Sequence, residues 1–287
     1  MGGGRPILVG VDGSDPALAA VRWAAAEAGL RGAALRLVFA FAGMSAPGLP
    51  GREFGFREGV LKEADGWLAR AAEQVPQGVE VTTEVLDGHP VPRLVAEASE
   101  AQLAVVGDRG RGGLVGLLVG SVAAAVATHA TCPVVVVHGT DRPAVGPVVV
   151  GVDGSPVSED ALAFAFDAAA ARRVPLVAVH SYEPPFFHPD SAIVVDWEAV
   201  HTEEQEVLAE RLAGWGERYP DVPVERVVVQ GVPAAALVEQ SETAQLVVVG
   251  SHGHGSLAGL ILGSVSRAVL HRARCPVAVV RGAEGLR

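Results

Sequence analysis

The sequence predicts an α/β protein with two doubly wound domains, each a five-stranded parallel sheet of order 3-2-1-4-5 with helices on both faces. The first observation behind this prediction is an internal repeat, because Ile7–Ser14 (ILVGVDGS) returns as Val148–Ser155 (VVVGVDGS). The second is that short apolar, β-branched runs alternate with Ala-rich helical patterns. The third is that these runs are continuously apolar, which is typical of strands that a parallel sheet buries on both faces. Such alternation with right-handed crossovers gives a doubly wound domain.

The apolar runs predict strands in order along the chain. In the first copy, strands are expected at Ile7–Val11, Leu35–Phe41, Val79–Leu86, Leu103–Gly107 and Val134–His138. Helices are expected between them, at Asp15–Leu30, Phe56–Gln74, Val91–Ser99 and Ser121–His129. In the second copy, strands are expected at Val148–Val152, Leu176–His180, Val224–Val229, Leu246–Gly250 and Val277–Arg281.

The repeat also predicts the domain boundaries. Three further motifs of the first copy return in the second. Leu103–Gly110 corresponds to Leu246–Gly253, Gly120–Val122 corresponds to Gly263–Val265, and Cys132–Val134 corresponds to Cys275–Val277. We therefore expect one domain over residues 1–143 and a second copy over residues 144–287. The junction near Gly139–Pro147 has the Gly and Pro content of a short linker.

Composition excludes several classes of protein. With 49% hydrophobic and 19% charged residues, the chain has enough apolar material for a core, so disorder is a poor interpretation. A net charge of −11 and only 5% aromatic residues argue against nucleic-acid and anionic-membrane partners. Two cysteines do not make a secreted disulfide framework. The expectation is a cytoplasmic protein without a targeting signal or a membrane span.

The repeated motifs follow the first and fourth strands of each copy, which flank the switch point of a sheet with this order. Ligands of open α/β sheets bind there, beyond the carboxyl ends of the strands. The longer motif is Gly107-x2-Gly110-x9-Gly120-Ser121, and Gly250-x2-Gly253-x9-Gly263-Ser264 in the second copy. Glycines let a backbone approach a ligand, and the helix that opens after the last glycine presents free N–H groups to a phosphate. Ser121 and Ser264 can cap that helix and donate a hydroxyl to the same anion. The alternative is an ordinary turn followed by a helix N-cap, with no ligand.

These motifs resemble the universal stress protein family in its tandem-domain form, and the glycine loop resembles that of its ATP-binding branch. The resemblance covers both halves nearly end to end, and it implies ATP as the ligand, with Mg²⁺ as a candidate accompanying ion. It implies that Asp12 and Asp153 contact the adenosine, with Gly10 and Gly151 beneath it. The residues that would hold the ribose and phosphates are Gly107, Gly110, Gly120, Ser121 and Val122, with Gly250, Gly253, Gly263, Ser264 and Val265.

Other residues near these motifs leave alternatives open. Asp12 could simply cap the following helix, unless Ser14 does so. Arg109 and Arg111 of the first loop correspond to His252 and His254 of the second. All four side chains could pair with phosphates, or they could be solvated loop residues. Cys132 and Cys275 precede a proline and are expected to be small buried residues. The stretch 183–190 (EPPFFHPD) could be a lid or an ordinary connection.

The function expected from these residues is nucleotide-dependent regulation, with one nucleotide site in each domain. A slow ATP hydrolase or nucleotidyl transferase is the alternative, although no catalytic residue, acid–base pair or metal cluster stands out beside the loop. A structural protein with a vestigial site is a third possibility, which the intact glycines disfavour. The apolar fifth strands, at Pro133–Val137 and Pro276–Val280, predict pairing of the two domains and, beyond that, a homodimer. The regulated partner is unknown.

Overall fold

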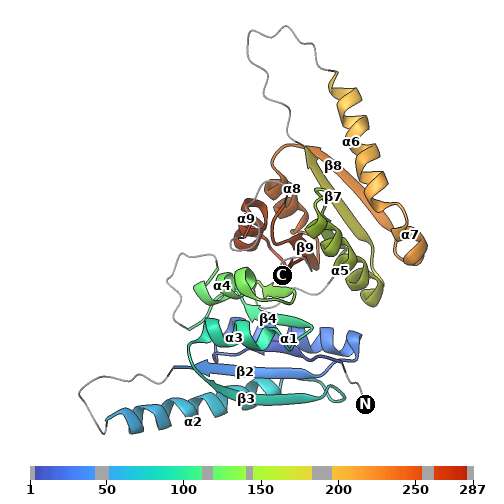
Figure 1. The fold of residues 1–287 in the computed structure, drawn as a ribbon. Helices are drawn as coiled ribbons and strands as arrows, with labels where there is room; N and C mark the ends of the chain where they lie inside the picture. The colour runs from blue at the N-terminus through green and yellow to red at the C-terminus, as the bar shows by residue number, and fades with distance from the viewer. Residues whose placement is uncertain are drawn as a thin grey trace, which may run out of the picture. The chain divides into compact units, whose positions relative to one another are not determined.

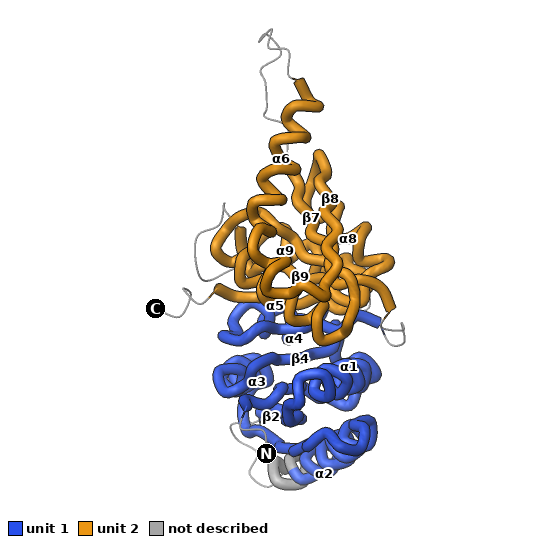
Figure 2. The backbone as a smooth tube through the Cα atoms, turned by 90° about the vertical axis from the view of Figure 1, so that its right-hand side faces the viewer, with its two compact units in different colours: residues 1–142, 286 blue, residues 143–285, 287 orange. Residues whose placement is uncertain are grey.

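The computed structural model describes residues 4–42, 52–111, 119–139, 145–182, 196–253 and 262–282, with only the backbone of residues 52–57. The chain divides into two compact units, which we call unit 1 (Met1–Arg142) and unit 2 (Pro143–Gly285) (Figure 2). No helix among the described residues is long and apolar enough to cross a membrane.

Unit 1 has the predicted doubly wound architecture (Figure 1). Its strands are β1 (Ile7–Gly10), β2 (Leu35–Phe41), β3 (Val81–Asp87), β4 (Leu103–Gly107) and β5 (Val134–Val137). Its helices are α1 (Asp15–Arg31), α2 (Arg52–Ala72), α3 (Pro90–Ala98) and α4 (Ser121–His129). The strands lie in the order β3-β2-β1-β4-β5, and every neighbouring pair is parallel. The fold class predicted from the sequence is confirmed.

Unit 2 repeats this architecture with one addition. Its strands are β6 (Val148–Gly151), β7 (Leu176–Tyr182), β8 (Val224–Gln230), β9 (Leu246–Gly250) and β10 (Val277–Val280), in the order β8-β7-β6-β9-β10 and all parallel. Its helices are α5 (Pro156–Arg172), α6 (Trp197–Leu212), α8 (Pro233–Gln240) and α9 (Ser264–Arg272). The addition is a single turn, α7 (Trp215–Arg218), which the sequence pattern did not predict.

The helices cover both faces of each sheet because the direction of winding reverses at the central strand. In unit 1, α1 and α2 pack on one face while α3 and α4 pack on the other. The core between these layers is aliphatic, and Ile7, Leu37 and Leu103 are fully buried in it. Val9 lies beside Val105 in the parallel register of β1 and β4, so these two strands end side by side. The loops that follow β1 and β4 therefore leave the sheet next to each other.

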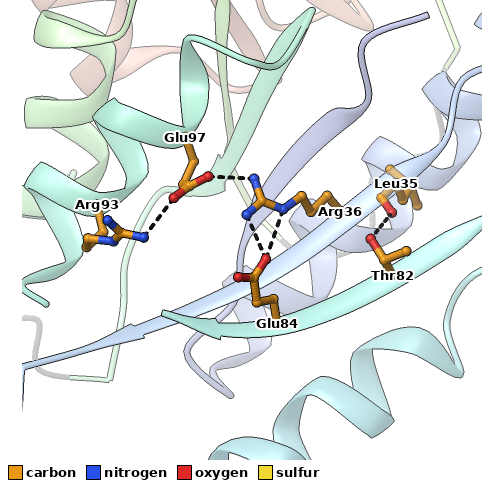
Figure 3. A network of polar contacts seen from close by, with 6 residues as sticks. All are labelled: Leu35, Arg36, Thr82, Glu84, Arg93 and Glu97. Carbon is orange, nitrogen blue, oxygen red and sulfur yellow. Dashed lines mark hydrogen bonds and ion pairs between the residues drawn. The ribbon is translucent and has the colours of Figure 1, made fainter. Parts of the chain in front are cut away.

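A network of charged side chains fastens α3 to the outer strands of unit 1 (Figure 3). The guanidinium of Arg36 on β2 donates to Glu84 on β3 and to Glu97 on α3, each at 2.6 Å, and Arg93 also donates to Glu97, at 2.9 Å. Burial by itself lowers the pKa of Arg36, but its bonds to the two carboxylates outweigh that effect and the pKa is raised. Val177 takes the equivalent place on β7 of unit 2, and this uncharged side chain cannot form the corresponding ion pairs.

Both cysteines are buried and neither forms a disulfide, so we expect them to resist alkylation in the folded protein. Burial raises the pKa of the Cys132 thiol to about 11, although hydrogen bonds from its own backbone and from Ala104 act in the opposite direction. The folded thiol therefore stays protonated at pH 8, whereas an unfolded thiol with a pKa of about 8.5 forms the reactive thiolate readily. Iodoacetamide labelling of Cys275→Ala, followed by mass spectrometry, measures this directly.

The control is the same variant in a denaturing concentration of guanidinium chloride, in which Cys132 should react within minutes. Equal labelling rates at pH 8 with and without denaturant would contradict the buried, protonated state of this thiol.

Candidate functional site

Asp12 and Asp153 shape the turns that follow β1 and β6. Oδ1 of Asp12 accepts hydrogen bonds from the backbone N–H of Ser14 at 3.0 Å and from its hydroxyl at 2.5 Å. Asp153 accepts the same two bonds from Ser155, at 2.9 and 2.6 Å. The helix N-caps are the serines, because Ser14 accepts from Ala17 N–H and Ser155 from Ser158 N–H. The aspartates therefore do not cap α1 and α5.

The second oxygen of Asp12 ties this turn to the loop after β4. Oδ2 accepts a hydrogen bond from the backbone N–H of Arg111 at 2.9 Å. Gly110 makes the approach possible, because a Cβ at this position would lie 2.5 Å from the same oxygen. A Cβ on Gly253 would collide with Oδ2 of Asp153 in the same way. These glycines are required by contacts within the protein itself, in addition to any contact with a ligand.

We expect Asp12→Asn to release the loop after β4 while keeping the turn after β1. The asparagine oxygen can still accept from Ser14, but its NH₂ group cannot accept the N–H of Arg111. Because this bond is exposed to solvent, losing it should cost unit 1 about 0.5–1.5 kcal/mol of unfolding free energy. Urea unfolding followed by circular dichroism measures this loss.

Asp12→Ala is the matched variant, because it also removes the bonds to Ser14. It should destabilise unit 1 more than Asp12→Asn does. An Asp12→Asn protein as stable as wild type would mean that the bond to Arg111 does not hold the loop.

The loop after β4 closes on the helix that follows it, and the same closure occurs after β9. Gly120 N–H donates to Asp108 C=O at 2.7 Å, and Gly263 N–H donates to Ser251 C=O at 2.8 Å. Gly120 and Gly263 are the N-caps of α4 and α9, without a side-chain capping bond. The expectation that Ser121 and Ser264 cap these helices was therefore wrong.

Each of these two serines is instead the exposed first residue of its helix. The first N–H groups of a helix have no intrahelical acceptor, and together with the helix dipole they favour an anion. Because the cap is a glycine without a side chain, the serine hydroxyl stays available to the same anion. The two helix starts can therefore bind a phosphate or a carboxylate.

Unit 2 contains a cavity of about 560 Å³ at the carboxyl ends of its central strands. This volume lies within the range of about 300–1,000 Å³ that small-molecule sites occupy. All the unit 2 site residues that were predicted from the sequence and that the structure describes line this cavity, and they are Gly151, Asp153, Gly250, His252, Gly253, Gly263, Ser264 and Val265. His254 lies outside the described residues, as does the 183–190 stretch. Motifs that lie far apart in the sequence thus meet around one space.

Other residues of this cavity were missed in the sequence. Val179 and Ser181 come from β7, Ser158 from the first turn of α5, and Pro233 and Leu237 from α8. The β7 residues could have been found, because that strand neighbours β6 and ends at the same edge of the sheet. Nothing in the local pattern distinguishes the other three from ordinary helix residues.

The corresponding residues of unit 1 occupy the same ends of the same elements. Gly10 ends β1 against Leu94 of α3, as Gly151 ends β6 against Leu237 of α8. Gly107 ends β4, and Ser121 and Val122 begin α4 after Gly120. The site residues expected in the two units thus occupy equivalent positions of the fold.

The structure describes three of the four loop residues for which the sequence left alternatives open, and these are Arg109, Arg111 and His252. Arg111 is exposed, and its guanidinium lies over the ring of Trp67 on α2, 4.3 Å from the ring centroid. Arg109 is exposed, and its Nε lies 3.6 Å from Oδ2 of Asp108. His252 lines the cavity, with Nδ1 3.0 Å from the Ser251 hydroxyl. Among the described residues, no three His, Cys, Asp or Glu side chains form a group that could hold a metal ion.

The fold and the site define a class: tandem doubly wound α/β proteins with a small-molecule cavity at the switch point of the sheet. The Universal stress protein family matches residues 4–138 and 145–281. The chain therefore belongs to the universal stress protein family, and both of its repeats do.

Proteins of that name are similar over nearly the whole chain. The universal stress protein Rv2005c of Mycobacterium tuberculosis is 45% identical over 293 residues, which is 96% of each chain. The universal stress protein Rv2623 of the same organism is 44% identical over 289 residues, again 96% of each. A crystal structure of a universal stress protein from Archaeoglobus fulgidus matches with a TM-score of 0.75 at 20% identity, covering 98% of this chain and 100% of that one. The last similarity shows a shared fold.

Proposed function

We propose that this universal stress protein binds ATP at the switch points of its sheets and acts as a nucleotide-dependent regulator. The observation that carries the proposal is the unit 2 cavity, because it joins the two elements that a nucleotide needs. One is an apolar floor from Val179, Val249 and Leu237, which suits an adenine ring. The other is the start of α9 at Ser264, which suits phosphates.

The residues present fit this ligand. Asp153 lines the cavity at the end of β6 and is exposed, so its carboxylate is accessible to ribose hydroxyls. Gly263 leaves little room for a side chain, since a Cβ there would lie 3.2 Å from the Cα of His252. The glycine therefore leaves the backbone at the start of α9 without a side chain between it and the cavity. In this assignment Mg²⁺ accompanies the phosphates, because that ion is usually held through one or two carboxylates and the substrate phosphates.

The test is calorimetric titration of the purified protein with ATP, together with a measurement of phosphate release under excess ATP and Mg²⁺. Saturable ATP binding with a turnover far below one per minute supports a regulator. Turnover at the common enzyme rates of about 1–10³ s⁻¹ would favour an ATP hydrolase instead. Failure of ATP to bind at millimolar concentration would overturn the proposal.

Ser264→Glu is the variant that connects the measurement to the cavity. A glutamate at the first position of α9 is compatible with the helix dipole, so the helix should keep its stability. Its carboxylate takes the place of the phosphate and should weaken ATP binding in unit 2. Arg267→Gln, on the same helix and exposed, is the matched control, because it also makes the protein more negative by one charge.

The same proposal includes assembly through the fifth strand of each unit and a homodimer of two chains. These remain predictions from the apolar sequences of the two strands. Sedimentation velocity of the intact protein, with and without ATP, measures the number of chains in the particle.

A further inference from the structure

The loops after β4 and β9 differ at one buried position. Asp108 follows Gly107 in unit 1, and Ser251 follows Gly250 in unit 2. Only 5% of Asp108 and 2% of Ser251 is exposed. The backbone places both residues alike, since each carbonyl accepts the N–H of the glycine that caps the next helix. Unit 1 thus buries an acid where unit 2 buries a hydroxyl, directly beside the start of the helix that is proposed to hold phosphate.

The charge of Asp108 is poorly compensated within the described part of unit 1. Its Oδ1 is buried and accepts no hydrogen bond from those residues. Its Oδ2 lies 3.6 Å from Arg109 Nε, beyond hydrogen-bonding distance, and the Arg109 side chain is 55% exposed, so solvent and salt screen that pair. The other cation of the loop, Arg111, is engaged over Trp67.

A buried negative charge at this place opposes an anionic ligand. The positive end of the α4 dipole acts over about the first turn of the helix, where Asp108 already offsets it. Charges inside a protein are screened less than charges at its surface, so the two exposed arginines cannot fully restore the attraction. Ser251 has no such effect on α9, because its side chain is uncharged.

We propose that Asp108 makes the unit 1 site select against polyphosphates, so that unit 1 takes the nucleoside in preference to the triphosphate. Unit 2, with Ser251, keeps the preference for the triphosphate. This inference rests on the proposed function and concerns only the charge of the ligand that each unit accepts.

The experiment isolates one phosphate site at a time. Ser264→Glu leaves the phosphate site of unit 1 intact, and Ser121→Glu leaves that of unit 2. Into the first we introduce Asp108→Ser and into the second Ser251→Asp, which exchanges the residues of the two loops. ATP and adenosine are titrated by calorimetry into all four proteins with divalent cations chelated, because bound Mg²⁺ would mask the charge of ATP.

Asp108→Ser should tighten ATP binding about tenfold in the Ser264→Glu protein, which corresponds to about 1.4 kcal/mol. Ser251→Asp should weaken ATP binding about tenfold in the Ser121→Glu protein. Adenosine affinity should be equal within each pair, because adenosine has no phosphate for the charge to act on. An ATP affinity that changes less than twofold on Asp108→Ser, or an equal change for adenosine, would overturn the inference.

Folding of the variants does not decide the outcome. Asp108→Ser removes a buried oxygen without a partner among the described residues, so its melting temperature should equal or exceed that of the Ser264→Glu parent. Ser251→Asp buries a charge and could lower stability, so the Asp108→Ser pair alone is sufficient for the test. If the Ser121→Glu protein does not bind ATP, the proposed function fails and this inference with it. If that protein binds ATP and Asp108→Ser has no effect, only this inference fails.

Discussion

Gly107→Ala is expected to destabilise unit 1 by about 3 kcal/mol, the upper part of the range for overpacked sites. A Cβ on Gly107 would lie 2.6 Å from the carbonyl carbon and oxygen of Pro16 and 2.9 Å from the nitrogen of Ala17. All three atoms belong to the backbone at the start of α1, so no side chain can rotate away, and α1 must shift from the sheet. Urea unfolding followed by tryptophan fluorescence measures the change in free energy.

Two other glycines provide matched controls. A Cβ on Gly250, the counterpart in unit 2, would meet Val157 Cγ1 at 3.0 Å and His252 O at 3.3 Å, and a valine side chain can move. Gly250→Ala should therefore cost about 1 kcal/mol, at the low end of the same range. Gly29 of α1 has no atom within 4 Å of its would-be Cβ, so Gly29→Ala should stabilise unit 1 by about 0.5–1 kcal/mol through helix propensity. A Gly107→Ala protein within about 1 kcal/mol of wild type would disprove the close contact with α1.

Phe166→Ala is expected to cost unit 2 about 3–5 kcal/mol, the usual loss when a buried phenylalanine is removed. Phe166 is fully buried on α5. Its ring stacks on Trp215 with centroids 5.1 Å apart and on Tyr219 with centroids 5.2 Å apart. These two partners belong to α7 and its C-cap, so the substitution should also detach that turn. Trp215 fluorescence during urea unfolding reports on both effects.

Tyr219→Phe separates the aromatic packing from the polar contact of the same cluster. The Tyr219 hydroxyl donates to Asp167 at 2.5 Å, and the variant removes this bond while keeping the ring. It should cost about 1 kcal/mol, the net value of one hydrogen bond. If Phe166→Ala costs no more than Tyr219→Phe, the stacked rings do not hold α7 in place.

Much of the fold could be predicted because its signals are local. The apolar runs at Leu35–Phe41 and Leu103–Gly107 are strands with the predicted bounds, and Ser121–His129 is a helix with the predicted bounds. Such runs form strands wherever a parallel sheet covers them, so their composition alone is informative. The one-turn helix α7 has no such signal, since it depends on the stacking of Trp215 on a phenylalanine of another helix.

The candidate site could be predicted in part for the same reason. The repeated glycines and Asp153 could be placed at one edge of the sheet because strand order follows from the alternation of strands and helices. The capping function assigned to Ser121 was wrong, because Gly120 before it already has the extended backbone of an N-cap and α4 begins one residue later. Ser158 was missed, because its place in the cavity depends on how α5 meets β9.

The sequence by itself determined the two repeats, the order of their elements and the edge of each sheet at which the glycine loops lie. These follow from the periodicity of the residues, from the reach of short connections and from the handedness of crossovers. Each of these depends on residues close together in the sequence or on a general rule of chain connection. Only the tertiary structure decided that Gly107 lies against α1, that Arg111 covers Trp67 and that the buried Oδ1 of Asp108 has no hydrogen-bond partner among the described residues. Those facts depend on atoms from segments far apart in the chain that approach within a few ångströms, and dense packing makes distances of that size decisive.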